Sequence, residues 1–196
     1  HIQSKLKGPI FSIITPFTKK GEIDYLSLQK YINYLYSKGA TNFYIMVYNS
    51  RFTLLNEREI LKINLFCIKQ VKKLNNQNII ICAEPYHCST EQTVKYVNYF
   101  KKNGADIVSL IFGEKYYSDD QLYGHFKKVH DKTNCFLLLH QQILENGISS
   151  DPPFVYYSLE VLRKISKLNK FLAMKEDAKN ETYTRRICEE ISNQMI

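Results

Sequence analysis

The sequence has no long apolar segment. Within its 196 residues, no hydrophobic run approaches the about 20 residues that a membrane-spanning helix needs. The N-terminal stretch His1–Lys7 has no apolar core of the kind found in secretory signals. These absences predict a cytoplasmic protein without a membrane partner.

The sequence also lacks closely spaced pairs of cysteines. The chain has five cysteines, and no two of them form a CxxC pair. An odd number of cysteines without metal-ligand spacing predicts reduced, mostly buried thiols and no metal site.

The net charge of +8 comes from 27 basic and 19 acidic residues. The lysines are scattered along predicted helices, and no nucleic-acid-binding motif accompanies them. We therefore expect no nucleic-acid partner, and a positive potential that attracts an anionic substrate.

Apolar, β-branched runs recur along the chain with amphipathic stretches of helical period between them. Successive runs begin roughly 30 residues apart, which is the length of one βα unit. The six runs are Ile10–Thr15, Phe43–Val47, Ile79–Cys82, Ile107–Phe112, Phe136–Leu139 and Phe171–Met174.

Local signals agree with this division. Capping-box spacings predict three helix starts, and glycines at positions 39 and 104 predict two helix ends. The three capping pairs are Asn56 with Glu59, Ser89 with Gln92, and Ser118 with Gln121.

The predicted fold class is α/β, a TIM (β/α)8 barrel of which this chain covers about the first six βα units. Strands that are apolar throughout must be covered on both faces, and the chain has no GxGxxG fingerprint of an open dinucleotide-binding sheet. A complete barrel usually needs about 250 residues, and a seventh run only begins at Met195-Ile196. We therefore expect residues 1–196 to form a single barrel domain that is incomplete at its C-terminus.

Lys175 is the strongest candidate for chemistry, because it directly follows the apolar run Phe171–Met174. We expect it at the C-terminal tip of a strand, where barrel enzymes place catalytic groups. Burial disfavours the charged form of an amine and so favours its attack on a carbonyl to form a Schiff base. Polar residues follow the other strands, which suits carbonyl chemistry with proton transfer: Tyr48–Arg51, Glu84–His87, Glu114–Tyr117 and His140–Gln142.

Several segments together resemble the dihydrodipicolinate synthase/N-acetylneuraminate lyase family, whose members are Schiff-base class I aldolases on a TIM barrel. The chain is similar to the N-terminal two-thirds of that family over nearly its whole length. The segments that carry the resemblance are Gly8–Ile10, Thr15–Phe17, Gly21–Asp24, Leu55–Glu59, Leu122–Phe126 and Met174–Glu176.

The resemblance implies roles for individual residues. Lys175 forms an imine with a 2-oxo acid such as pyruvate, and His140 stands where the family has its catalytic tyrosine. A second family tyrosine corresponds to Tyr117. In the family, a glycine-containing loop holds the substrate carboxylate. This chain has a different segment there, and three of its side chains can bind the carboxylate: Asn49, Ser50 and Arg51.

The resemblance further implies 2-oxo acid and aldehyde substrates, no metal or organic cofactor, and a homo-oligomer, either a dimer or a tetramer. Glu145 stands where dihydrodipicolinate synthase has the arginine that grips a second carboxylate. A glutamate repels a dianionic substrate, so we expect a lyase or aldolase other than dihydrodipicolinate synthase itself.

Two alternatives stay open. The loss of the glycine loop favours a non-catalytic barrel used for binding or assembly. A metal-dependent aldolase would instead use His87, Glu114 and His140, which are chemically suitable ligands at predicted strand ends.

Overall fold

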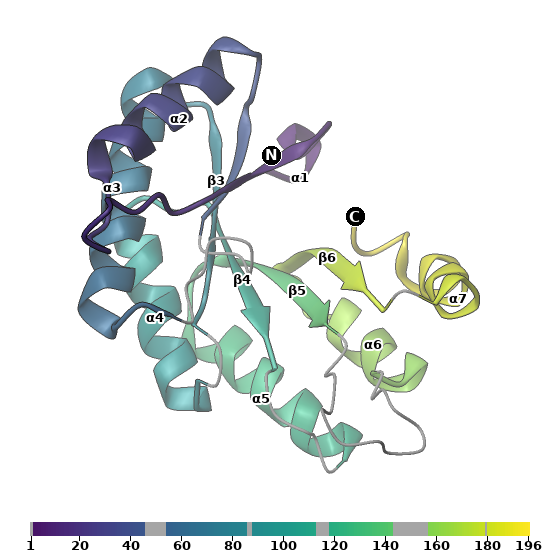
Figure 1. Ribbon diagram of the computed structural model, residues 1–196. Helices are drawn as coiled ribbons and strands as arrows, with labels where there is room; N and C mark the ends of the chain where they lie inside the picture. The colour runs from purple at the N-terminus through teal and green to yellow at the C-terminus, as the bar shows by residue number, and fades with distance from the viewer. Residues whose placement is uncertain (1, 46–53, 86–87, 113–117, 143–156, 179) are drawn as a thin grey trace. The chain divides into compact units, whose positions relative to one another are not determined.

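A computed structural model of the chain describes residues 2–45, 54–85, 88–112, 118–142, 157–178 and 180–196 (Figure 1). Strands and helices alternate along these residues. The strands are β1 (Ile10–Ile13), β2 (Asn42–Ile45), β3 (Ile79–Ala83), β4 (Ile107–Ile111), β5 (Phe136–Gln142) and β6 (Phe171–Asp177). The helices are α1 (Ile2–Lys5), α2 (Tyr25–Ser37), α3 (Glu57–Leu74), α4 (Thr90–Lys102), α5 (Asp119–Lys132), α6 (Leu159–Ser166) and α7 (Glu181–Ile191).

The six strands form one sheet in sequence order, β1-β2-β3-β4-β5-β6. The pairs β1–β2, β2–β3 and β5–β6 are parallel, and one helix follows each strand. A parallel pair needs a long crossover connection, and these helices provide it. The predicted α/β class with six βα units is therefore confirmed.

The predicted apolar runs coincide with the strands, and β2, β3 and β4 are buried along their whole length. The ends of β5 and β6 differ from the prediction. Both strands continue three residues beyond their apolar runs, to Gln142 and Asp177. The polar residues that we expected at strand ends or in loops therefore lie within these two strands.

The local signals at helix ends are confirmed in the structure. Asn56 and Glu59 form a complete capping box at the start of α3, and Ser89 and Gln92 bond each other's backbone N–H in the same way. Gly104 has a φ of 104°, a left-handed conformation that glycine adopts at low cost. A Cβ at this position would also lie 3.2 Å from Ile68 Cγ2.

The chain divides into two compact units, and each has its own core. The first comprises residues 1–85 and 99–108, where α2 packs against α3 and the side chains of Phe43, Ile63 and Ile80 are buried. The second comprises residues 86–98 and 109–196.

In the second unit α6 packs against both α5 and α7. The Phe126 ring of α5 meets that of Phe171 edge to face, with centroids 5.8 Å apart. Both side chains are buried, so they join the helix layer to the sheet.

The end of the chain extends the edge of the sheet. Ile196 donates its N–H to the Leu172 carbonyl at 3.0 Å, and its own carbonyl accepts from Met174 N–H at 2.8 Å. One residue bonded on both sides of Ala173 is the pattern of a parallel pair. It agrees with the apolar run predicted to begin at Met195.

Among the described residues, every helix is too short or too polar to cross a lipid bilayer.

Candidate active site

Lys175 lies within β6, two residues before the strand ends at Asp177. Its side chain is 37% exposed among the described residues. The amine is therefore half-buried rather than fully buried, and it lies near the C-terminal end of the strand rather than at its last residue. The polar stretch Lys175–Asp177 extends the strand because its backbone pairs with β5.

His140 is the direct neighbour of Lys175 across the sheet. The two residues are register partners between β5 and β6, so their side chains leave the same face of the sheet. His140 Nε2 lies 3.1 Å from Lys175 Nζ, and only 4% of His140 is exposed. The structure thus brings together two residues that lie 35 positions apart in the sequence.

Asp177 completes this group, and the sequence analysis did not identify it. Its Oδ2 accepts a hydrogen bond from Lys175 Nζ and lies 3.1 Å from His140 Nε2. Residues two apart on a strand share a face, so the spacing to Lys175 was a usable signal. The apolar run predicts a strand that ends at Met174, which would leave Asp177 in the following loop.

The pKa values in this group are shifted by identifiable causes. Burial lowers the pKa of His140 below its ordinary value, the positive charge of Lys175 lowers it further, and Asp177 opposes both effects. The pKa of Asp177 is well below its usual range, chiefly because of its hydrogen bond with His140 and then because of Lys175. Near neutral pH the group therefore holds a neutral imidazole and a carboxylate.

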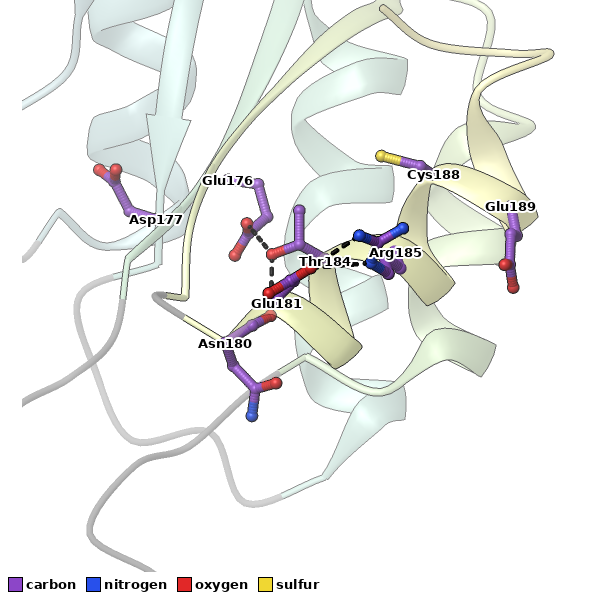
Figure 2. Close-up of a pocket in the computed structure, with 8 residues that line it drawn as sticks. All are labelled: Glu176, Asp177, Asn180, Glu181, Thr184, Arg185, Cys188 and Glu189. Atoms are coloured by element: carbon purple, nitrogen blue, oxygen red, sulfur yellow. Dashed lines mark hydrogen bonds and ion pairs between the residues drawn. The ribbon is translucent and has the colours of Figure 1, made fainter.

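The other face of β6 is occupied by a different contact. Glu176 accepts from the Thr184 hydroxyl at 2.6 Å and from the Ala178 N–H. Figure 2 shows a pocket along β6 and α7. Within it, Glu176 points toward Thr184, whereas Asp177 points away from Thr184. The alternation along β6 therefore gives adjacent carboxylates separate surroundings, one beside the helix and one beside Lys175.

Other predicted site residues lie outside the described residues: Asn49, Ser50, Arg51, Tyr117 and Glu145. The same holds for His87 and Glu114 of the metal-dependent alternative. Within the part of the chain that the structure describes, no three His, Cys, Asp or Glu side chains are arranged to hold a metal ion.

Comparisons with known proteins all point to one enzyme family. A sequence model of the Dihydrodipicolinate synthetase family matches residues 5–196. The chain is 25% identical over 175 residues to the 4-hydroxy-tetrahydrodipicolinate synthase of Anaplasma marginale (strain Florida), covering 88% of this chain and 54% of the relative. It is 27% identical over 177 residues to the enzyme of the same name from Clostridium perfringens (strain SM101), with 87% and 55% covered. The chain thus spans about half the length of these relatives.

Solved structures share the fold. Dihydrodipicolinate synthase from Aquifex aeolicus matches with a TM-score of 0.81 at 22% identity, covering 97% of this chain and 61% of the other. The chloride-inhibited dihydrodipicolinate synthase from Acinetobacter baumannii, solved with pyruvate, matches with a TM-score of 0.83 at 18% identity, with 97% and 62% covered. This likeness confirms the predicted barrel fold, of which the chain covers six units.

Proposed function

Because this chain belongs to the Dihydrodipicolinate synthetase family, we propose that the protein is a class I lyase or aldolase. Lys175 forms a Schiff base with the keto group of a 2-oxo acid such as pyruvate. The observation that carries this proposal is the 3.1 Å separation between Lys175 Nζ and His140 Nε2. Imine formation needs an amine that has lost its proton, and a neutral imidazole at this distance can accept that proton.

The proposal assigns the remaining roles by resemblance. Asn49 and Ser50 hold the carboxylate of the bound oxo acid, and Arg51 adds a positive charge beside it. Tyr117 relays protons together with His140. The second substrate is an aldehyde, and the protein acts as a homo-oligomer without a metal or organic cofactor.

We propose that the protein prefers an aldehyde other than the one used by dihydrodipicolinate synthase. Glu145 stands where the synthase has an arginine for a second carboxylate. A negative side chain there disfavours an aldehyde that carries its own carboxylate. The preferred aldehyde is therefore expected to be neutral, and initial rates with a matched neutral and acidic aldehyde pair would test this.

Reductive trapping tests the Schiff base directly. Incubation of the full-length protein with pyruvate and borohydride should add to Lys175 the mass of pyruvic acid less one oxygen atom, located by peptide mass spectrometry. Lys175→Ala should abolish both the adduct and turnover. Lys164→Ala is the matched control, because Lys164 lies in the same unit but pairs with Glu160 on the exposed surface of α6.

The same experiment separates the alternatives. A non-catalytic barrel or a metal-dependent aldolase would give no adduct with the unaltered protein. Turnover of a 2-oxo acid that survives Lys175→Ala would show that the class I assignment is wrong.

A further inference from the structure

The geometry points to Asp177 as a positioning residue that holds Lys175 and His140 together for proton transfer, an inference that rests on the proposed Schiff-base function. Asp177 does not itself contact the reacting carbonyl in this scheme. Its carboxylate instead fixes the two groups that do.

The contacts form a closed triangle. One oxygen of Asp177, Oδ2, contacts both Lys175 Nζ and His140 Nε2. The third side is the 3.1 Å separation between Nζ and Nε2. Each of the three groups thus touches the other two, so a shift of one side chain alters the two contacts that this side chain makes.

The backbone explains why the triangle forms. His140 and Lys175 are register partners, and Asp177 follows Lys175 by two residues on the same strand. All three side chains therefore leave one face of the sheet. The group stands on paired strands rather than on a loop, which keeps its geometry well defined.

The chemistry of His140 gives Asp177 its role. Nε2 has room for one proton or one lone pair, so it can donate to Asp177 or accept from Lys175 but not both at once. The carboxylate stabilises the ammonium when the proton is on Lys175 and the imidazolium when it is on His140. Because one anion serves both states, the proton can pass between them without leaving a charge unpaired.

Imine formation begins with a proton transfer and ends with the loss of water. The Lys175 ammonium gives one proton to His140 Nε2, and the free amine lone pair attacks the keto carbon while the carbonyl π electrons move to oxygen. A proton moves from the nitrogen to that oxygen, giving a carbinolamine. His140 then returns its proton to the hydroxyl, the C–O bond breaks, and water leaves. The net change is ammonium plus ketone to protonated imine plus water, with His140 neutral at the start and at the end, and Asp177 ionised throughout.

The electrostatics of the described residues support this arrangement. Among the residues that the structure describes, Lys175 and Asp177, both on β6, are charged groups that act on His140. Asp177 raises the pKa of His140, whereas Lys175 and burial lower it. Removal of the Asp177 charge should therefore lower the pKa of His140, whereas removal of the Lys175 charge should raise it.

NMR titration of the His140 ring in the substrate-free, full-length protein tests the inference, with the signal assigned by its loss in His140→Gln. Asp177→Asn should move the His140 titration to lower pH, and Lys175→Met should move it to higher pH. Glu181→Gln removes the same charge from the same pocket, but Glu181 is 79% exposed and pairs with Arg185. That control should leave the His140 titration unchanged.

Trapping kinetics provide the second readout. Asp177→Asn should slow imine formation with pyruvate by about 10²-fold, the scale on which small misplacements of reacting groups act, while the affinity for pyruvate stays near that of the unaltered protein. A His140 titration that does not move in Asp177→Asn, or a trapping rate equal to that of Glu181→Gln, would overturn the inference. A moved titration with no adduct in the unaltered protein would reject the Schiff-base function and leave the triangle of contacts intact.

Discussion

Single residues decide the chemistry proposed for this protein. Lys175 supplies a primary amine, His140 an imidazole base whose pKa is lowered by burial, and Asp177 a fixed negative charge. The pairing of β5 with β6 is made by backbone groups, so it does not require these particular side chains. The identity of the side chains, not the scaffold, therefore sets the reaction.

Replacement of His140 by Phe should keep a planar aromatic ring but remove the proton acceptor. The adduct with pyruvate should still form, at a rate lower by about 10²- to 10⁴-fold, the usual contribution of a general base. Borohydride reduction at a series of reaction times, followed by mass spectrometry of the adduct, measures this rate. His130→Phe is the control, because His130 contacts Asn169 and Asp131 instead of the triangle.

The pH profile of the same reaction follows from the pKa of His140. Below that pKa the imidazole is protonated and cannot accept a proton, so the rate falls as pH decreases through it. Burial places this pKa below the ordinary value of 6.5, so the acidic limb should lie below pH 6.5 and should be lost in His140→Phe. A limb at or above pH 6.5, or one that persists in the variant, would contradict the assignment.

At the scale of elements, strand length proved harder to predict than strand identity. The apolar runs identify all six strands, but β5 and β6 continue through polar residues to Gln142 and Asp177. Their backbones remain paired there, and a sheet ladder depends on backbone groups rather than on side-chain polarity. That extension is what places Asp177 on the face of Lys175.

Helix starts were predictable, because capping is local. Asn56→Ala should destabilise the protein by about 1 kcal/mol through loss of the bond to the Glu59 N–H, a typical value for an N-cap. Urea unfolding measures the change. Lys69→Ala, on an exposed position of α3, should change stability by less than about 0.5 kcal/mol; equal losses in both variants would argue against the cap.

At the scale of the whole molecule, stability should depend on pH through His125. This side chain of α5 is 7% exposed, its Nδ1 lies 2.9 Å from Thr90 Oγ1, and burial lowers its pKa to about 4. The folded state therefore disfavours the protonated form. Its contribution is complete above the unfolded pKa of about 6.5 and is lost as pH falls toward 4.

The size of this effect follows from linkage. The difference between the two pKa values corresponds to about 3 kcal/mol. Urea unfolding at pH 7 and pH 4.5 should show a loss that is reduced in His125→Gln, because glutamine does not titrate. A pH dependence unchanged in that variant would show that other groups cause it.

The sequence by itself determined the order of elements, the parallel α/β class and the lysine at the sixth strand. These depend on period, capping and apolar runs, which are local properties of the chain. Only the tertiary structure decided that His140 and Lys175 are register partners and that Asp177 joins them. Cross-strand register joins residues distant in the sequence, and a shift of one residue would turn each side chain to the other face. The exposure of Lys175 likewise depends on what surrounds it in space, which a local pattern does not encode.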